Sequence, residues 1–444
     1  MESTWRLVAG GSRLILFLLL IASLNAQTIT VTTGTTYQTM KGWEGVEQTC
    51  QDECTNWNSY KESLLDAVVE LGINRIRLEV LTNSTCTAST WNYTDLDNKI
   101  NKVVNPLRTR LAAIGETLWV NLCVVDNEEC YGNAGGANRP LSEYASRFRL
   151  AAQHIQSTFG WLPNSYEVAL EPEVVSFWWR TSDVNNAIPL LRTELINAGI
   201  TSPYIIAPST PAGSVTFNNY FDALSTTNRG YLSELAYHRY DTVTPSHITS
   251  RATAAGVPPS MLEHYGSGHQ DLHVDLKDIG VVAWERFSLA WWDEPSYRET
   301  GYFEIQGGIS GTTYIMSDQT KYLRQYFKHV RLNAVRVAAS SSNGNLDPVA
   351  FVNANGKTVV VVKAAASATN FTIGGLPANT YGIFYTTSSA YNQVLSNQTI
   401  TAGQNITTSI PAAGVITIYA LNADGGTVPR RKPSGRVTAA GGVR

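Results

Sequence analysis

Two glutamates follow directly on short apolar runs that are typical of buried strands. "YEVALEPE" (166–173) ends in Glu171 and Glu173, and "SMLE" ends in Glu263. Buried strands avoid charge, so these strands are expected to deliver carboxylates to a site; the simpler alternative is that a polar loop begins there. Two carboxylates that face each other across a cleft can hydrolyse a glycoside. One protonates the leaving oxygen, and the other attacks the anomeric carbon or activates water.

Polar residues near other strand ends fit the same chemistry. Arg77 would keep a nucleophilic carboxylate ionised, Tyr240 could donate a hydrogen bond to it, and His238 could contact the acid or substrate hydroxyls. A structural alternative stays open for each of them. Arg77 could simply pair with Glu79, and His238 and Tyr240 could be ordinary inward-facing strand residues. Their joint occurrence at strand ends, in order along the chain, favours the catalytic interpretation.

The elements that must position these groups alternate between helix and strand from about residue 60 to 330. "SYKESLLDAVVELG" (59–72) has helical apolar spacing and a glycine stop, and the strand-like "INRIRLEV" (73–80) follows. About eight such units predict an α/β fold in which parallel strands are covered by helices, a (β/α)8 TIM barrel rather than an open sheet. Residues 335–421 instead show alternating strands separated by Gly, Asn and Pro turns, which predicts an appended antiparallel β-sandwich.

Both ends of the chain differ from these two domains. Arg6 and Arg13 precede the apolar stretch "LILFLLLIA", which is short for a bilayer span, so we expect a signal peptide, with an uncleaved anchor as the alternative. The protein would then be exported, extracellular or periplasmic, with no stable membrane span after cleavage. The predicted organisation is a signal peptide over 1–26, N-terminal strands over 27–40 that join the side domain, the barrel over 41–334, the β-sandwich over 335–422 and a disordered tail over 423–444.

Composition narrows the choice of partners. Lys+Arg number 33 against 36 Asp+Glu, a net charge of −3, and basic residues cluster only at the C-terminus, which argues against nucleic acid as a partner. The 11 Trp and 21 Tyr suit a core but also a cleft that stacks sugar rings. The five cysteines contain no Cys-x-x-Cys pair, which argues against a zinc site. One or two disulfides stay open, Cys123 with Cys130 among them.

Several motifs together resemble glycoside hydrolase clan A, and most closely family 30, the group of glucosylceramidases, glucuronoxylanases and β-1,6-glycanases. "QTMKGWEGVEQ" (38–48) is similar to the opening of the family's first barrel strand, "EPE" to the acid motif of the fourth strand, "AYHRYD" to the sixth strand and "MLEHYG" to the nucleophile segment of the seventh. "KYLRQYFKHVRLNAVRVAAS" (321–340) resembles the helix that joins the barrel to a side β-domain. The resemblance covers nearly the whole chain after residue 26.

This resemblance implies a retaining double displacement with no metal or organic cofactor. Glu171 would be the acid/base and Glu263 the nucleophile, supported by Arg77, His238 and Tyr240. The sequence departs from the clan at Leu170, where an Asn normally reaches the sugar 2-hydroxyl. An apolar side chain cannot supply that hydrogen bond. Asn121 and Asp126, near the end of the third strand, are possible substitutes.

Substrate-binding candidates are mostly aromatic, and each has an ordinary packing alternative. The predicted set is Trp43, Asp126, Trp178, Trp179 and Trp292. "SFWWR" directly follows the acid loop, which favours Trp178 or Trp179. The eighth barrel strand is open between "FSLAWW" (287–292) and "GYFEI" (301–305). The latter would put Glu304 on or near the rim.

The sequence therefore predicts an exported retaining glycoside hydrolase that acts on a β-linked oligo- or polysaccharide. The alternative is a catalytically impaired carbohydrate-binding protein on the same fold. Leu170 favours the alternative, and the presence of both Glu171 and Glu263 favours the enzyme.

Overall fold

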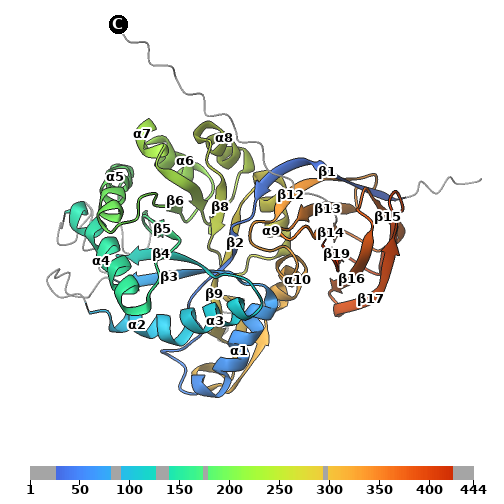
Figure 1. Ribbon diagram of the computed structural model, residues 1–444, viewed down its shortest axis with the longest axis horizontal. Helices are drawn as coiled ribbons and strands as arrows, with labels where there is room; N and C mark the ends of the chain where they lie inside the picture. Colours follow the sequence, from blue (N-terminus) through green and yellow to red (C-terminus); the bar gives the residue numbers. More distant parts are fainter. Residues whose placement is uncertain (1–26, 82–91, 127–139, 174–178, 294–298, 424–444) are drawn as a thin grey trace, which may run out of the picture.

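A computed structural model describes residues 27–81, 92–126, 140–173, 179–293 and 299–423, and shows a helix-covered barrel beside an all-β domain (Figure 1). The predicted (β/α)8 barrel with an appended β-sandwich is confirmed. The predicted signal peptide and nearly all of the predicted tail lie outside the described residues. In the part of the chain that is described, no helix has both the length and the apolar character needed to cross a membrane.

Eight parallel strands close the barrel, because the last one pairs with both the first and the seventh. The strands are β2 (Gly42–Val46), β3 (Arg75–Leu81), β4 (Trp119–Val125), β5 (Ser165–Glu167), β6 (Ile205–Thr210), β7 (Leu232–Tyr237), β8 (Pro259–Leu262) and β9 (Ala283–Trp292). The eighth strand is therefore the one that contains "FSLAWW". The alternative segment forms β10 (Gly301–Gln306), which extends the sheet outward and pairs with β11 (Thr313–Met316).

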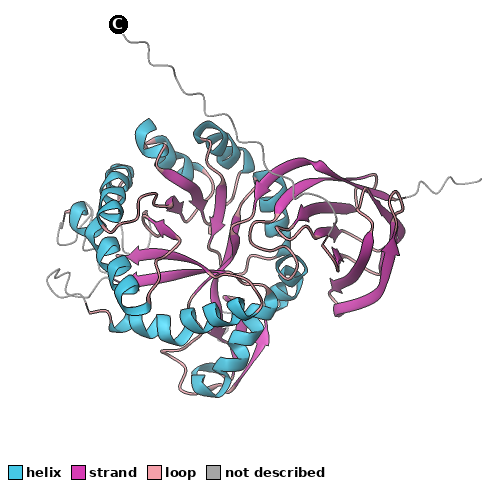
Figure 2. Ribbon diagram, viewed as in Figure 1, coloured by secondary structure: helices cyan, strands magenta, loops and turns pink. Residues whose placement is uncertain are grey.

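Helices surround these strands, whereas the second domain is built of strands (Figure 2). The α-helices are α1 (Trp57–Leu71), α2 (Thr94–Lys99), α3 (Asn105–Ala113), α4 (Leu141–Phe159), α5 (Thr181–Asn197), α6 (Val215–Asp222), α7 (Thr226–Arg229), α8 (Pro245–Ala255), α9 (His269–Val274) and α10 (Asp318–Phe327). Short π-helical turns, η1 (Ile100–Val104) and η2 (Asp275–Ile279), continue α2 and α9, and a 3-10 turn, η3 (Gly308–Ser310), precedes β11. Helix α1 ends at Gly72, whose φ is 114° and where a Cβ would lie 2.3 Å from the Phe327 carbonyl oxygen. Only glycine permits this close approach of α10.

Strand β3 supplies charged groups to the barrel interior because its side chains alternate in direction. Arg75, Arg77 and Glu79 all point inward, at successive heights toward the carboxyl end of the strand. Arg75 is fully buried and forms ion pairs with Glu44 at 2.5 Å and Glu234 at 2.8 Å. Because Arg75 neutralises Glu44 and Glu234, Arg77 can pair with carboxylates nearer the carboxyl end of the strand.

The second domain is a nine-stranded sheet that folds into a mixed β-sandwich. Its strands are β1 (Thr28–Thr39), β12 (Val335–Ser341), β13 (Leu346–Val352), β14 (Thr358–Ala364), β15 (Ala368–Gly374), β16 (Asn379–Thr387), β17 (Ala390–Ile400), β18 (Ile406–Ile410) and β19 (Gly414–Ala420). The N-terminal β1 pairs antiparallel with β12 and parallel with β15, so the start of the described chain joins this domain. Val359 and Val361 of β14 pack toward the barrel, whereas Val360 and Val362 pack inside the sandwich. The strand is thus buried on both faces and fixes the two domains together.

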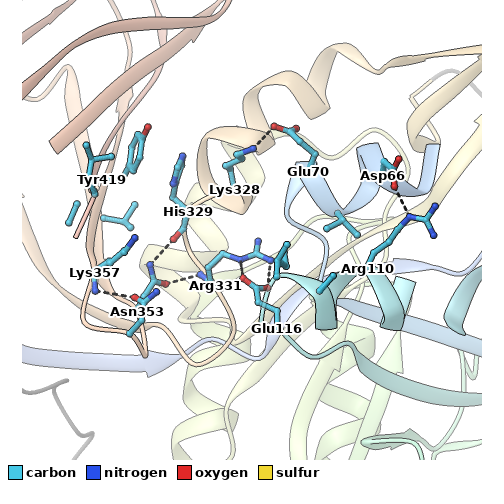
Figure 3. A pocket seen from close by; sticks show the side chains of 17 residues that line it. Asp66, Glu70, Arg110, Glu116, Lys328, His329, Arg331, Asn353, Lys357 and Tyr419 are labelled. Atoms are coloured by element: carbon cyan, nitrogen blue, oxygen red, sulfur yellow. Dashed lines mark hydrogen bonds and ion pairs between the residues drawn. The ribbon is translucent and has the colours of Figure 1, made fainter. Parts of the chain in front are cut away.

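A crevice of about 650 Å³ lies between the two domains, and we call it the interdomain crevice. Its charged lining includes Asp66, Glu70, Arg110, Glu116, Lys328 and Arg331. Figure 3 shows that these charges face one another and pair. Arg331 donates to Glu116 at 2.8 Å, Arg110 donates to Asp66 at 2.7 Å, and Lys328 binds Glu70.

The disulfide differs from the pairing considered from the sequence. Cys50 is bonded to Cys54, within the loop that follows β2. Cys123 is buried on β4 and is a free cysteine, so its pairing with Cys130 is wrong. The spacing of cysteines along the chain does not by itself show which of them are bonded. Cys50 and Cys54 are four residues apart and meet because their Cα atoms lie 5.2 Å from each other.

Candidate active site

The two predicted catalytic glutamates each follow a barrel strand directly. Glu171 lies just beyond β5, the fourth barrel strand, and Glu263 follows β8, the seventh. Both have backbone conformations that non-glycine residues rarely adopt, with φ of 43° at Glu171 and 152° at Glu263. Such strain persists only where the surrounding structure imposes it, and it is concentrated at functional sites. The backbone amide of Glu171 donates to the Ser209 carbonyl at 3.0 Å, which holds the turn against β6.

The two carboxyl groups lie close together on the rim. One ligand atom each from Glu171, His238 and Glu263 lies within 4.8 Å of the others, and all three residues are buried. Carboxyl groups about 5–5.5 Å apart are typical of retaining glycosidases, whereas inverting enzymes need about 6.5–9.5 Å to admit a water molecule. The limit of 4.8 Å applies to the nearest ligand atoms of the residues and is compatible with the shorter of these two spacings.

Glu263 is held as an anion by its neighbours. Tyr240 donates its hydroxyl to Oε1 at 2.7 Å, and the guanidinium of Arg77 binds Oε2. Burial by itself would raise the pKa of Glu263, but the charges of Arg77 and His238 and the hydrogen bonds from Arg77 and Tyr240 together outweigh burial, and the net pKa lies below its usual value. Arg77 is fully buried and also donates to Glu79 at 3.1 Å and to the Leu262 carbonyl at 3.1 Å. Its orientation is therefore fixed before any ligand arrives.

Glu171 has a different environment, in which its carboxyl group is hydrogen-bonded to a histidine. The Nδ1 atom of His238 lies 2.8 Å from Glu171 Oε1. Burial by itself would lower the pKa of His238. The hydrogen bond to Glu171 and the charge of Glu171 act in the opposite direction, and the net pKa lies above its ordinary value. Within the described part of the chain, Nε2 of this buried ring has no hydrogen-bond partner. The imidazole of His238 is in direct contact with the Glu171 carboxyl group through Nδ1.

A cavity of about 640 Å³ opens over these groups, and we call it the rim cavity. Its lining includes Leu170, Glu171, Glu173, Tyr240, Glu263 and Tyr265. Leu170 thus faces the cavity. Asn121, considered as its polar substitute, donates to Glu167 at 2.8 Å inside the barrel and does not line the cavity. Asp126 is buried at the end of β4 and does not line it either.

Two aromatic walls of this cavity were missed from the sequence. The rings of Tyr265 and Phe287 meet edge to face at 5.1 Å, and Tyr265 also meets Tyr240 at 5.1 Å. Tyr265 remains 44% exposed, so a ligand can reach it. The sequence offered one indication of this role, because Tyr265 stands two residues after Glu263 in "MLEHYG".

The predicted tryptophans mostly fill the core. Trp43 is 1% exposed, stacks on Phe327 at 4.4 Å and donates to the Val330 carbonyl at 2.6 Å, so its assignment to substrate is wrong. Trp179 is also 1% exposed and packs on Tyr144 at 4.7 Å, which corrects that assignment too. Trp292 is half-buried at the end of β9, stacks on Trp291 at 4.3 Å and does not line the rim cavity. Trp178 lies outside the described residues.

Glu171, His238 and Glu263 could also surround a cation, but most of their ligand atoms already bind protein groups. Both oxygens of Glu263 bind protein donors, Glu171 binds His238, and the charge of Arg77 would repel a metal ion. The arrangement therefore favours acid–base and nucleophilic chemistry over metal chemistry.

Solved structures of glycoside hydrolases have the same fold, a (β/α)8 barrel with a β-sandwich at its side. Residues 333–418 match the model of the glycosyl hydrolase family 30 beta sandwich domain. The predicted resemblance to family 30 is thereby confirmed. No curated protein sequence matches the chain significantly.

Solved structures share the whole two-domain fold. A family 30 endoxylanase from Clostridium papyrosolvens aligns with a TM-score of 0.67 at 19% identity, over 88% of this chain and 99% of its own. A conserved exported protein from Bacteroides fragilis aligns with a TM-score of 0.72 at 13% identity, over 88% and 100%. An endo-β1,6-glucanase aligns with a TM-score of 0.64 at 16% identity, over 90% and 95%. At such low identities the likeness establishes the fold, and the chemistry must be argued from this chain's own residues.

Proposed function

We propose that the protein is a retaining glycoside hydrolase that cleaves a β-linked oligo- or polysaccharide. The observation that carries this proposal is the pair of buried carboxyl groups within 4.8 Å, one paired with an arginine and the other with a histidine. A carboxylate paired with an arginine suits a nucleophile, and a carboxyl group in contact with an imidazole suits an acid/base.

In the first step, the carboxylate of Glu263 attacks the anomeric carbon while Glu171 passes its proton to the glycosidic oxygen. The bond to the leaving sugar breaks, and a glycosyl ester with Glu263 forms. Arg77 and Tyr240 keep Glu263 ionised and aimed, because both bind its oxygens. In the second step, Glu171 takes a proton from water, the water attacks the anomeric carbon, and Glu263 is released as a carboxylate.

Aromatic side chains of the same cavity support substrate binding. Tyr265 and Phe287 present aromatic surface to the cavity, and aromatic faces pack well against the apolar face of a sugar ring. We further propose that the protein is exported, which rests on Arg6, Arg13 and the apolar stretch 14–22.

A second candidate function is a carbohydrate-binding protein that has lost turnover. The observation in its favour is Leu170, which lines the cavity beside Glu171 and offers no hydrogen bond. The two functions differ in one measurable respect, since only the enzyme releases product.

The test is incubation of the purified protein with a panel of β-linked polysaccharides and aryl β-glycosides, beside Glu263→Gln. Product release that disappears in Glu263→Gln supports the hydrolase and identifies the substrate class. The anomeric configuration of the first product, followed by NMR, tests retention. Sugar binding without product release from any member of the panel would favour the binding protein.

A further inference from the structure

Glu173 lies in the rim cavity but takes no part in the mechanism above. It follows Glu171 by two residues, across Pro172, and lines the same cavity. The turn is anchored on both sides, because the Glu171 amide donates to the Ser209 carbonyl at 3.0 Å and the Trp179 amide donates to the Pro172 carbonyl at 2.8 Å. Glu173 is therefore presented to the cavity by a turn of defined position.

Its carboxyl group differs from those of its neighbours in having no side-chain partner among the described residues. Glu79 and Glu263 pair with Arg77, and Glu171 pairs with His238. Neither buried oxygen of Glu173 accepts a hydrogen bond from another described residue, and its own backbone amide is the only hydrogen-bonding group that lowers its pKa. A buried polar atom left unsatisfied costs free energy, so this arrangement is unfavourable unless a ligand completes it.

Burial has a further effect on Glu173, since it raises the pKa of this carboxyl to about 7. At neutral and mildly acidic pH a large share of the group is therefore a carboxylic acid, which can donate one hydrogen bond and accept others. A sugar hydroxyl also both donates and accepts, so the two groups are complementary. An ionised carboxylate could only accept.

We propose that Glu173 is a substrate-positioning residue that hydrogen-bonds a sugar hydroxyl next to the bond that is cleaved. The neighbouring lining supports this role, because Leu170 and Ala212 offer no side-chain polar atom and leave that part of the cavity to Glu173. The inference rests on the proposed glycosidase function and deepens it. Glu173 would bind the sugar hydroxyl equally in the ground state and in the transition state, whereas Glu171 would transfer the proton.

The test compares Glu173→Ala and Glu173→Gln with the wild type on the best aryl β-glycoside of the panel. Ala removes the hydrogen bond, and we expect KM to rise about 10-fold with kcat changed less than about threefold, the effect of one hydrogen bond in uniform binding. Gln keeps a donor and an acceptor in the same place, so KM should stay within about threefold of the wild type. Glu304→Ala, a half-buried glutamate on β10 outside the cavity, is the matched control and should leave both constants unchanged.

A set of substrates that each lack one hydroxyl identifies the contact. The deoxy substrate that loses the contacted hydroxyl should lose about the same factor with the wild type as Glu173→Ala loses with the full substrate. The two losses should not add when combined, because they remove the same hydrogen bond. Additive losses for every hydroxyl would overturn the inference.

Other outcomes separate this inference from the function on which it rests. Wild-type activity with an unchanged KM in Glu173→Ala overturns the positioning role and leaves the hydrolase intact. A kcat that falls equally in Ala and Gln would make Glu173 a proton donor and overturns it as well. If the wild type neither cleaves nor binds any member of the panel, the proposed function fails first. Thermal unfolding of each variant shows whether a change in KM reflects a folding defect.

Discussion

The rim cavity and the interdomain crevice have nearly the same size, about 640 and 650 Å³, and both are lined by charged residues. They differ in how these charges are satisfied. In the crevice, every acidic side chain of the lining forms an ion pair, and Arg110, Lys328 and Arg331 provide the partners. His329, which also lines it, is kept neutral because burial lowers its pKa to about 3.

Acidic side chains predominate in the lining of the rim cavity. Among the described residues, its lining carries the carboxyl groups of Glu79, Glu171, Glu173, Asp241 and Glu263 but no lysine or arginine. Arg77 lies behind the lining and is shared by two of these groups. Charges that pair with each other have no capacity left for a ligand, whereas unbalanced carboxyl groups cost free energy that only a function explains. The balance of charge, and not the volume, distinguishes the site from the structural crevice.

Loss of the cation behind the rim cavity should have the largest effect. Arg77→Met leaves buried carboxyl groups unpaired, and the free energy of unfolding should fall by about 3–5 kcal/mol. The pKa of Glu263 should rise without the arginine, so fewer molecules carry the nucleophilic carboxylate in acid and the acid limb of kcat/KM moves to higher pH. Urea unfolding and a pH–rate profile measure both effects. An unchanged acid limb in a folded variant would contradict the role of Arg77.

Removal of one hydrogen bond in the same cavity should have a smaller effect. Tyr240→Phe deletes the hydroxyl that donates to Glu263 at 2.7 Å. A hydrogen bond to a charged group contributes about 1.5–3 kcal/mol, so kcat/KM should fall about 10-fold or more. Steady-state kinetics measure the loss, and Tyr419→Phe in the interdomain crevice is the control that should not change it. Equal activity in both variants would remove Tyr240 from the machinery.

A charged contact between the two domains should affect stability in a pH-dependent way. Asp347 of β13 binds Lys277 and contacts His273 at 3.3 Å. Burial would raise the pKa of Asp347, but these hydrogen bonds and charges hold it well below its usual value. The folded pKa is therefore below the unfolded one, so the contact stabilises the protein above about pH 4 and the benefit is lost as the pH falls.

Asp347→Asn should accordingly lower the free energy of unfolding by about 1 kcal/mol at neutral pH, since solvent screens this partly exposed group. The difference from the wild type should shrink in acid. Urea unfolding at neutral pH and in acid measures this difference in the free energy of unfolding. Glycosidase activity should not change. A difference that grows in acid would contradict the assigned sign.

The smallest effect is expected for an exposed pair of the interdomain crevice. Arg110→Met breaks contacts with Asp66 and Glu62, whose side chains are 70% and 69% exposed. Exposed ion pairs contribute about 0–1 kcal/mol, so stability should fall by no more than this and the pH–rate profile should match the wild type. This variant is also the matched control for Arg77→Met. A loss as large as that of Arg77→Met would erase the contrast between the two regions.

Much of the fold could be read from the sequence because its local signals are strong. Helical spacing with a glycine stop identified α1, and alternating residues identified the strands of the second domain. Glu171 and Glu263 were expected at strand ends because charge at the end of an apolar run is conspicuous. The eighth strand stayed open because β9 and β10 are both real strands, and only pairing with β2 shows which one closes the barrel.

The aromatic residues of the site were predicted poorly for a physical reason. A tryptophan has the same local pattern whether its ring fills a core or faces a cleft, so Trp43 and Trp179 were assigned to substrate although both are buried. Tyr265 and Phe287 carried no distinguishing signal beyond their nearness to Glu263 and the last barrel strand. Direction depends on how neighbouring strands and helices pack, and that is not a local property.

The sequence by itself determined which chemical groups stand at the ends of the strands, because the polarity pattern of each short segment decides what it can bury. The tertiary structure decided what those groups do. Arg77 and Glu263 are 186 residues apart in the chain, and Glu171 and His238 are 67 apart, yet each pair is in direct contact. Coulomb energy and desolvation depend on distance and burial in three dimensions. Closure of the barrel therefore decided that Glu263 is paired with an arginine and that Glu171 is bonded to a histidine. It also left Glu173 with no side-chain partner among the described residues.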